Sequence, residues 1–388
     1  MPASLKNHFL LDPEIVFLNH GSFGATPRPV FETYQAWQRE LERQPVEFLG
    51  RRHNDLMREA RVKLGAYIHA EADDVVYVPN ATTGLNIVAR SLHLKPGDEI
   101  LTTDHEYGAL DRTWQFLCRQ TGAVYKQQPV PLPLTTADDF IEQFWAGVTP
   151  RTRVVFFSHI TSPTALIFPA QEICRRARQA GIISIIDGAH AVGQIPLDMQ
   201  TIGADFYSSN AHKWLCAPKG SAFLYARREM QCLVEPLVVS WGYESEKPGA
   251  SKFIDEQEWT GTRDIAAFLS VPAAIDFFAA HDWARVRLEC HALAQSARSR
   301  IAALTGLPPL CPDSSDWYMQ MFAAPLPPCD AAQVKIRLYD EFQIEVPIVT
   351  WQNRQFIRVS IQAYNSTDDI DRLIEALSMI FKDSRRIQ

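Results

Sequence analysis

The chain has 388 residues, of which 46% are hydrophobic and 21% charged, a balance typical of folded globular proteins that excludes an intrinsically disordered or fibrous chain. The 38 Lys and Arg residues against 45 Asp and Glu residues give a formal net charge of −7, and the absence of a long basic block disfavours nucleic acid as a partner. No apolar run reaches the roughly 20 residues needed to span a bilayer, so we expect no membrane segment.

The first residues and the cysteines bear on the cellular compartment. The apolar run at residues 9–11 is followed by Asp12 and is too short for the core of a secretory signal. The seven cysteines form no C-x-x-C pair and are odd in number. We therefore expect a cytoplasmic protein with free thiols rather than disulfides.

Short runs of β-branched and aromatic residues alternate with longer amphipathic segments from about residue 75 onward. The predicted strands are residues 75–78, 99–102, 154–158, 182–186, 206–208 and 222–225. The predicted helices between them are residues 85–92, 109–120, 140–146 and 171–180. Strands and helices in alternation indicate an α/β fold whose sheet is mostly parallel and covered on both faces.

The pattern changes after residue 265. Long helical segments at 266–280 and 283–304 precede a Pro-rich stretch at 308–328, a strand-like run at 356–361 and a closing helix at 367–381, for which Thr367 and Asp368 are the predicted caps. We therefore predict two domains. Residues 1–265 form an N-terminal segment and a large domain, and residues 266–388 form a small C-terminal domain.

Ligands of open α/β sheets bind beyond the carboxyl ends of the strands, so the polar residues that follow each apolar run are the first site candidates. Thr82 and Thr83 stand where the run 75–78 leads into a helix, and they can bind a phosphate there or simply cap the helix. His105 follows the run 99–102. An imidazole at that place can stack on a flat heterocycle or move a proton, but it can also be an ordinary turn residue.

Two further candidates carry charge. Asp187 ends an apolar run, where burial requires a cationic partner or a ligand. Lys213 lies among apolar residues beside His212, so it is either a partly desolvated nucleophile with a lowered pKa or a surface lysine whose stem packs on the protein. Together the candidates match the needs of pyridoxal phosphate, namely a lysine for the aldehyde, a carboxylate for the ring nitrogen and a helix N-terminus for the phosphate.

Three segments resemble the class V aminotransferase family, and more narrowly its isopenicillin N epimerase-like branch. They are residues 185–190 (IIDGAH), 209–224 (SNAHKWLCAPKGSAFL) and 259–264 (WTGTRD). The resemblance runs from Asn19 to Asn365. It implies a fold-type I pyridoxal phosphate-dependent transferase fold, with a mostly parallel seven-stranded sheet in the large domain and a smaller C-terminal α+β domain. It also implies pyridoxal 5'-phosphate as cofactor and a homodimer with active sites at the subunit interface.

The resemblance further implies roles for the matching residues. Lys213 would bind the cofactor aldehyde and act as catalytic base, Asp187 would pair with the ring nitrogen, and His105 would stack on the ring. Phosphate contacts are expected from Thr82, Thr83, His212 and, from the neighbouring subunit, Thr262; contacts to the ring hydroxyl are expected from His190 and Ser162. Arg358 matches the position that binds a substrate α-carboxylate, with a structural ion pair as its alternative. Asn19 and Arg263 are lesser substrate-binding candidates, and no metal ligands are expected.

Two departures from the family pattern matter. Asn210 replaces a small or hydroxyl residue beside the phosphate, which puts one phosphate contact in question. Cysteine desulfurases of the family carry a catalytic cysteine before the carboxylate-binding arginine, but residues 344–358 contain none, which disfavours persulfide formation. The dinucleotide, Walker A, zincin and nucleophile-elbow motifs are also missing.

The expected substrate is a small molecule, an amino acid or a compound that contains one. Arg358 would bind its carboxylate and Lys213 would remove the Cα proton. Epimerisation is the leading expectation because of the branch resemblance, with carbon–sulfur lysis of cysteine conjugates and transamination as alternatives. Epimerisation also needs a proton donor on the far face of the ring, where His105 would stack, so His105 is the second catalytic candidate; the sequence itself does not identify the second base. A non-catalytic sensor for the cofactor or an amino acid is a further alternative, disfavoured because Lys213, Asp187, His105 and Arg358 occur together.

Overall fold

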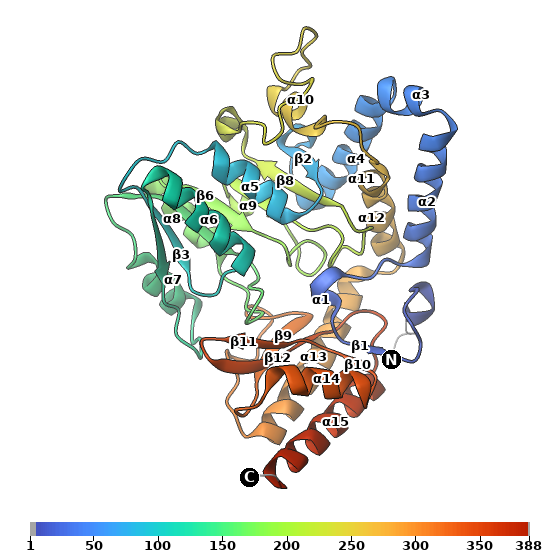
Figure 1. The fold of residues 1–388 in the computed structure, drawn as a ribbon, viewed down its shortest axis with the longest axis vertical. Coiled ribbons are helices and arrows are strands. Elements are labelled where there is room, and N and C mark those ends of the chain that lie inside the picture. Colours follow the sequence, from blue (N-terminus) through green and yellow to red (C-terminus); the bar gives the residue numbers. More distant parts are fainter. Residues whose placement is uncertain (1–4, 387–388) are drawn as a thin grey trace.

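A seven-stranded sheet forms the centre of the larger part of the molecule (Figure 1). The computed structural model describes residues 5–386. In spatial order the strands are β2 (Val75–Val78), β8 (Ala222–Ala226), β7 (Phe206–Ser209), β6 (Ile183–Asp187), β5 (Thr152–Ser158), β3 (Glu99–Thr103) and β4 (Val124–Gln128). Strand β8 runs antiparallel to its two neighbours, β2 and β7, and all other pairs in the sheet are parallel. The predicted mostly parallel seven-stranded sheet is confirmed.

Helices cover both faces of this sheet (Figure 1). They are α5 (Ala81–Ser91), α6 (Gly108–Thr121), α7 (Ala137–Trp145), α8 (Ala170–Gln179) and the short α9 (Met199–Ile202). Along β5, Val154 and Phe156 belong to one buried cluster, whereas Val155 and Phe157 belong to the other. Because successive side chains point to opposite faces, a strand covered on both sides is apolar throughout, which is why these runs were visible in the sequence.

Strand β4 was not predicted. Its residues, Val-Tyr-Lys-Gln-Gln, are exposed or half-buried, because β4 is the edge strand and pairs only with β3. An edge strand needs no continuous apolar run, so the sequence pattern gave no signal.

The smaller part of the molecule contains an antiparallel sheet of order β11 (Ile348–Trp351), β12 (Arg354–Ser360) and β9 (Met321–Pro325). Its helices are α13 (Trp283–Thr305), α14 (Ala331–Asp340) and α15 (Thr367–Arg386). Strand β9 lies inside the Pro-rich stretch 308–328, for which no strand was predicted. The cap of α15 is Ser366 rather than Thr367 or Asp368, because Ser366 Oγ accepts from Asp369 N while Ser366 N donates to the Asp369 carboxylate.

The remaining segments connect the two parts. They comprise β1 (Val16–Phe17), α1 (His20–Phe23), α2 (Arg28–Arg43), α3 (Pro45–Gly50), α4 (His53–Ile68), α10 (Lys252–Glu258), α11 (Ala266–Leu269), α12 (Val271–Ala280) and β10 (Ile344–Glu345), with 3₁₀ turns at Leu5–His8, Ala72–Asp74 and Arg228–Leu233. Strand β1 pairs with β10, which ties the N-terminal segment to the smaller part. Within residues 5–386, no helix is both long and apolar enough to cross a membrane.

The packing bears on the domain boundary. Helices α11 and α12 pack against α2, and both also contact α4, whereas α13 packs against β9 and α15 (Figure 1). The change of packing partner therefore falls between α12 and α13 rather than at residue 265. We propose a boundary near Asp282, after which the chain belongs to the smaller part.

Candidate active site

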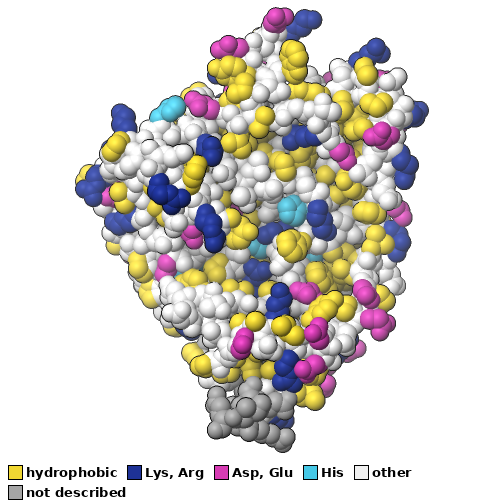
Figure 2. Space-filling model, in the orientation of Figure 1, with side chains coloured by type: hydrophobic (Ala, Val, Ile, Leu, Met, Phe, Trp, Pro, Cys, Tyr) yellow, Lys and Arg dark blue, Asp and Glu magenta, His cyan; other side chains and the backbone are white. Residues whose placement is uncertain are grey.

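Asp187 and Lys213 lie at the carboxyl edge of the large sheet. Asp187 is the last residue of β6 and is 4% exposed, and Lys213 follows β7 in a turn and is half-buried. The Lys213 amine lies 3.3 Å from Nε2 of His190. Figure 2 shows histidine, lysine and arginine side chains on this face near the middle of the molecule, between the larger and smaller parts.

Burial sets the protonation of both groups. It raises the pKa of Asp187 to about 6, although the Ala189 amide and the charge of Lys213 oppose the shift. It lowers the pKa of Lys213 to about 7, helped by the charge of Arg358 and opposed by Asp187. A lysine that loses its proton near neutral pH is a usable nucleophile. Asp187 forms no ion pair with the described side chains, those of residues 5–382, so this buried acid fits a protonated ring nitrogen.

Glu106, which the sequence analysis did not single out, is buried in the same part of the sheet. Its two oxygens lie 2.5 Å from Thr103 Oγ1 and 2.6 Å from Ser158 Oγ. Burial raises the pKa of Glu106 to about 8, and the charge of Asp187 adds to this rise. At pH 7 Glu106 is therefore neutral, which leaves Asp187 as the charged acid of this pair.

Glu106 gives a prediction for the free energy of unfolding. Between the ordinary glutamate pKa of about 4.3 and the folded value of about 8, the folded state holds one more proton than the unfolded state. The free energy of unfolding should therefore fall as the pH rises, by up to about 1.4 kcal/mol per pH unit from this group. In Glu106→Gln the slope should be shallower between pH 5 and 8, as measured by urea unfolding. An unchanged slope would contradict the neutral carboxyl.

The N-terminus of α5 is the predicted phosphate site. Asn80 Oδ1 accepts from Thr83 N at 2.8 Å, and Asn210 Oδ1 accepts from Ala81 N at 2.8 Å. Asn210 thus uses its carbonyl oxygen on the helix amide, which explains physically what the unexpected asparagine does. Thr82 and Thr83 are half-buried at this end, as a phosphate site there requires.

His212 is adjacent to the lysine and is held by the backbone. Its Nδ1 donates to the Ser221 carbonyl at 3.0 Å, since a carbonyl oxygen can only accept. Burial lowers the pKa of His212 to about 4, so the ring is neutral and Nε2 carries a lone pair. Direct donation from Nε2 to a phosphate therefore requires that the ring take up a proton when the phosphate binds.

Arg358, on β12, reaches into the site from the smaller part and is 7% exposed. Nη1 donates to the Ser162 carbonyl at 2.7 Å and contacts Ser162 Oγ at 3.2 Å, while Nη2 contacts Ser22 Oγ at 3.2 Å. Its Nε is buried with no hydrogen-bond partner in the described part of the chain, and the guanidinium forms no ion pair with the side chains of residues 5–382. An Nε–H and an Nη2–H remain, the side-on fork that binds a carboxylate through two hydrogen bonds.

Asn19 is linked to Arg358 through Ser22. Ser22 Oγ donates to Asn19 Oδ1 at 2.5 Å, and Asn19 Nδ2 donates to Glu345 Oε1 at 2.8 Å. Because the Ser22 proton is used on Asn19, the Ser22 oxygen is oriented to accept from Arg358. Asn19 therefore acts on the arginine through Ser22. Ser162, predicted beside the ring hydroxyl, likewise contacts Arg358.

His105 and Tyr107 differ sharply in exposure. The His105 ring is fully buried, with Nε2 donating to the Val130 carbonyl at 2.9 Å and Nδ1 accepting from Thr164 Oγ1 at 2.7 Å. Its ring lies 4.3 Å from that of Trp351, so neither nitrogen is free to move a proton. Tyr107 is 47% exposed at the start of α6 and interacts electrostatically with Arg358.

His20 holds the backbone of Lys213 through a hydrogen bond. It was not among the predicted site residues. Its Nε2 donates to the Lys213 carbonyl at 2.9 Å, and its Nδ1 accepts from the Tyr364 hydroxyl at 2.9 Å. Gly24 follows with φ of +71°, and a Cβ there would lie 2.0 Å from the His212 carbonyl oxygen. The run Asn19-His20-Gly21-Ser22 was the only sequence signal, because the partners are distant in the chain.

Thr262 and Arg263 are not brought to Lys213 within this chain. Thr262 is exposed. Arg263 donates to the Glu258 carbonyl at 2.9 Å and lies over the Phe268 ring at 4.8 Å. Within one chain, Arg263 therefore supports local structure between α10 and α11.

The chain is similar to known proteins over most of its length. The family model described as aminotransferase class V matches residues 17–373. An isopenicillin N epimerase from Amycolatopsis lactamdurans is 36% identical over 393 residues, covering 98% of both chains. A probable chloroplastic L-cysteine desulfhydrase from Arabidopsis thaliana is 28% identical, covering 96% of this chain and 84% of that protein.

Solved structures show the same fold at lower sequence identity. The apo cysteine desulfurase from Thermococcus onnurineus NA1 superposes with a TM-score of 0.84 at 20% identity, covering 99% of this chain and 98% of the other. A lysine-to-alanine mutant of C-DES, with glycine covalently linked to its pyridoxal phosphate, gives 0.82 at 21% identity, covering 97% of this chain and 99% of the other. The chain therefore belongs to the class V aminotransferase family and is a pyridoxal phosphate-dependent enzyme of fold type I.

Proposed function

We propose that the enzyme inverts the Cα centre of an amino acid or of a substrate that contains one. The observation that carries the amino-acid part is Arg358, a buried guanidinium with an unpartnered Nε and no carboxylate partner among the side chains of residues 5–382. The choice of epimerisation is supported by similarity over nearly the whole chain to a protein named isopenicillin N epimerase.

The site residues have separate tasks. Arg358 binds the α-carboxylate through Nε and Nη2, which leaves Ser162 and Ser22 to hold the guanidinium in place. Lys213 moves the proton at Cα, since its pKa of about 7 lets the amine accept and return a proton near neutral pH. Asp187 holds a proton at the ring nitrogen. Pyridoxal phosphate, when bound, supplies the electron sink that makes this Cα proton acidic.

Further cofactor contacts are part of the proposal. Thr82, Thr83 and His212 contact the phosphate, and His190 contacts the ring hydroxyl. We assign the stacking ring to Tyr107 instead of His105, because Tyr107 is exposed and His105 is enclosed by Thr164 and Trp351. We also propose a cytoplasmic homodimer in which the exposed Thr262 and the neighbouring Arg263 serve the partner subunit's site.

Carbon–sulfur lysis is the second candidate, because a full-length relative is named a probable L-cysteine desulfhydrase. Both reactions begin with removal of the Cα proton and differ in the next step. Lysis expels a β-sulfur group and yields a keto acid, whereas epimerisation returns a proton on the opposite face.

One experiment separates these reactions. The cofactor-loaded protein is incubated in deuterated water with a panel of amino acids, cysteine conjugates and aminoacyl peptides. We expect deuterium at Cα together with inversion, and no keto acid. Formation of pyruvate together with released thiol or sulfide would instead identify the enzyme as a lyase. Transfer of the amino group to an added keto acid would identify it as a transaminase. Asp187→Ala, which keeps the lysine, is the matched control and should lose exchange.

A further inference from the structure

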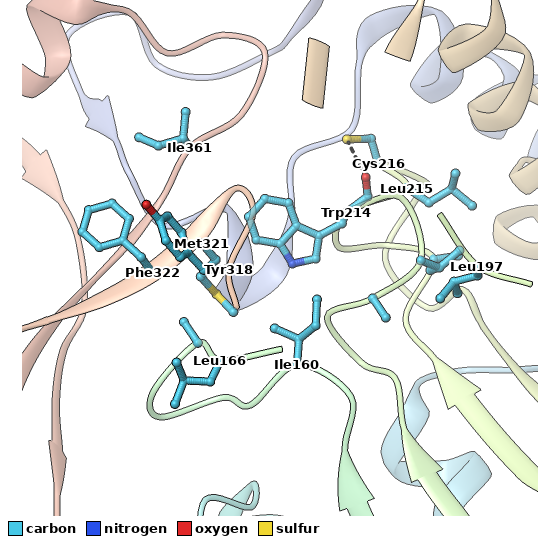
Figure 3. Packing of buried hydrophobic residues seen from close by; sticks show 14 of the residues in the cluster. Ile160, Leu166, Leu197, Trp214, Leu215, Cys216, Tyr318, Met321, Phe322 and Ile361 are labelled. Carbon is cyan, nitrogen blue, oxygen red and sulfur yellow. Dashed lines mark hydrogen bonds between the residues drawn. The ribbon is translucent and has the colours of Figure 1, made fainter. Parts of the chain in front are cut away.

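Trp214 lies next to the lysine and is fully buried. Its indole ring packs in the same cluster as Ile160 and Met321 (Figure 3). The indole Nε1 lies 3.2 Å from Nδ1 of His190, and Nε2 of the same histidine lies 3.3 Å from Lys213 Nζ. Three side chains thus form a hydrogen-bonded chain that ends at the lysine amine.

Hydrogen-bonding capacity fixes the direction of this chain. An indole N–H can only donate, so Nδ1 of His190 accepts and carries no proton. A neutral imidazole carries its proton on one nitrogen, so the proton of His190 is on Nε2. This Nε2–H donates to Lys213 Nζ. The lysine accepts only as an uncharged amine, because an ammonium group has no lone pair.

The charges around the chain agree with this assignment. Burial holds the pKa of His190 well below its usual range, and the positive charge of Arg358 adds to this shift, which disfavours a doubly protonated ring facing the indole N–H. The groups that act on Lys213 and His190 are Asp187 on β6, Arg358 on β12, His20 on α1 and His212 in the lysine turn. Asp187 is the one among these that favours the ammonium form.

We propose that Trp214 is a positioning residue that fixes the proton of His190 on Nε2 and thereby keeps Lys213 as the free amine that attacks an aldehyde. The inference deepens the proposed function, on which it rests for the role of Lys213. It also gives His190 a proton to donate to the ring hydroxyl oxygen of bound pyridoxal phosphate, the contact expected for this histidine.

The tautomer can be measured in the wild-type protein without cofactor. Nitrogen-15 NMR of the histidine-labelled chain, with a His190→Gln sample to assign the signal, distinguishes the two ring nitrogens. We expect a neutral ring protonated on Nε2 from pH 6 to 9. A proton on Nδ1, or an imidazolium at pH 7, overturns the proposal without requiring any tryptophan variant to fold.

A pair of variants tests the effect on the lysine. In Trp214→Phe, His190 is free to carry its proton on Nδ1, and Nε2 can then accept from an ammonium group. The pH midpoint for modification of Lys213 by cyanate in the cofactor-free protein, measured by peptide mass spectrometry, should rise by about one unit. Starting from a pKa of about 7, this means about fivefold slower modification at pH 7. If the pH midpoint of Lys213 modification is the same in folded Trp214→Phe protein as in the wild type, the proposal is overturned.

Trp283→Phe is the matched control, because Trp283 is 4% exposed and its Nε1 has no hydrogen-bond partner. It removes the same buried N–H away from the site and should leave the midpoint unchanged. Neither measurement uses a substrate, so the outcome is independent of whether the enzyme proves to be an epimerase or a lyase.

Discussion

Replacing Lys213 by alanine should abolish the covalent attachment of pyridoxal phosphate and lower turnover by about 10³-fold or more. The amine is both the expected point of attachment and the group that moves the Cα proton, and general acid–base catalysis alone contributes about 10²- to 10⁴-fold. The amine is half-buried beside His190 and has a pKa of about 7, so alanine removes both functions at once. Intact mass after borohydride reduction measures the attachment, and Cα deuterium exchange measures the turnover.

Lys219→Ala is the matched control for this experiment. Lys219 stands in the same loop but is exposed, and it forms no ion pair with any side chain that the structure describes, those of residues 5–382. The variant should keep both the reducible link and the exchange rate. Retention of a borohydride-stable adduct in Lys213→Ala, or its loss in Lys219→Ala, would contradict the assignment of Lys213.

The central sheet could be predicted because its strands are covered on both sides. Continuous apolar runs such as that of β5 arise directly from two covered faces, and the order of strands places the residues after them at one edge. Asp187 and Lys213 were identified for this reason. Their place at this edge of the sheet follows from their position after an apolar run, which the sequence records.

Other parts of the site depend on contacts that no local pattern records. Arg358 meets Ser22 and Ser162 only because β12 and the N-terminal segment fold against the sheet. Asn19 was predicted to contact substrate, yet its amide is used by Ser22 and Glu345. A sequence match identifies such residues as members of a site but does not say which of them faces the ligand.

The contrast between His105 and Tyr107 has the same origin. Both follow β3, and an exposed aromatic and a buried histidine two residues apart look alike in a sequence. Burial of His105 depends on Trp351, Thr164 and the Val130 carbonyl, which come from three separate segments. Likewise Glu106 is neutral because the fold buries it and the charge of Asp187 adds to the rise of its pKa, although hydrogen bonds from Ser158 and Thr103 oppose that rise. No propensity scale could report this balance.

Arg358→Met should raise KM for an amino-acid substrate by about 10²- to 10³-fold, because a buried charge-assisted pair with the α-carboxylate is lost. The variant should also lose its preference for an amino acid over the corresponding amide, which carries no negative charge. Arg354→Met is the control, since Arg354 is exposed on the same strand and should keep the wild-type KM. Steady-state kinetics on both substrates check this.

The same substitution should leave the free energy of unfolding of the ligand-free protein no lower than that of the wild type. A buried guanidinium without an acidic partner costs desolvation energy. The same desolvation lowers the pKa of Arg358 to about 10. Three contacts to Ser22 and Ser162 offset part of that cost, and methionine would fill the space without a charge. We therefore expect Arg358 to lower the stability of the ligand-free protein, and a carboxylate bound to its Nε and Nη2 to supply the missing negative charge. A large loss of stability in Arg358→Met would instead identify the arginine as a structural residue.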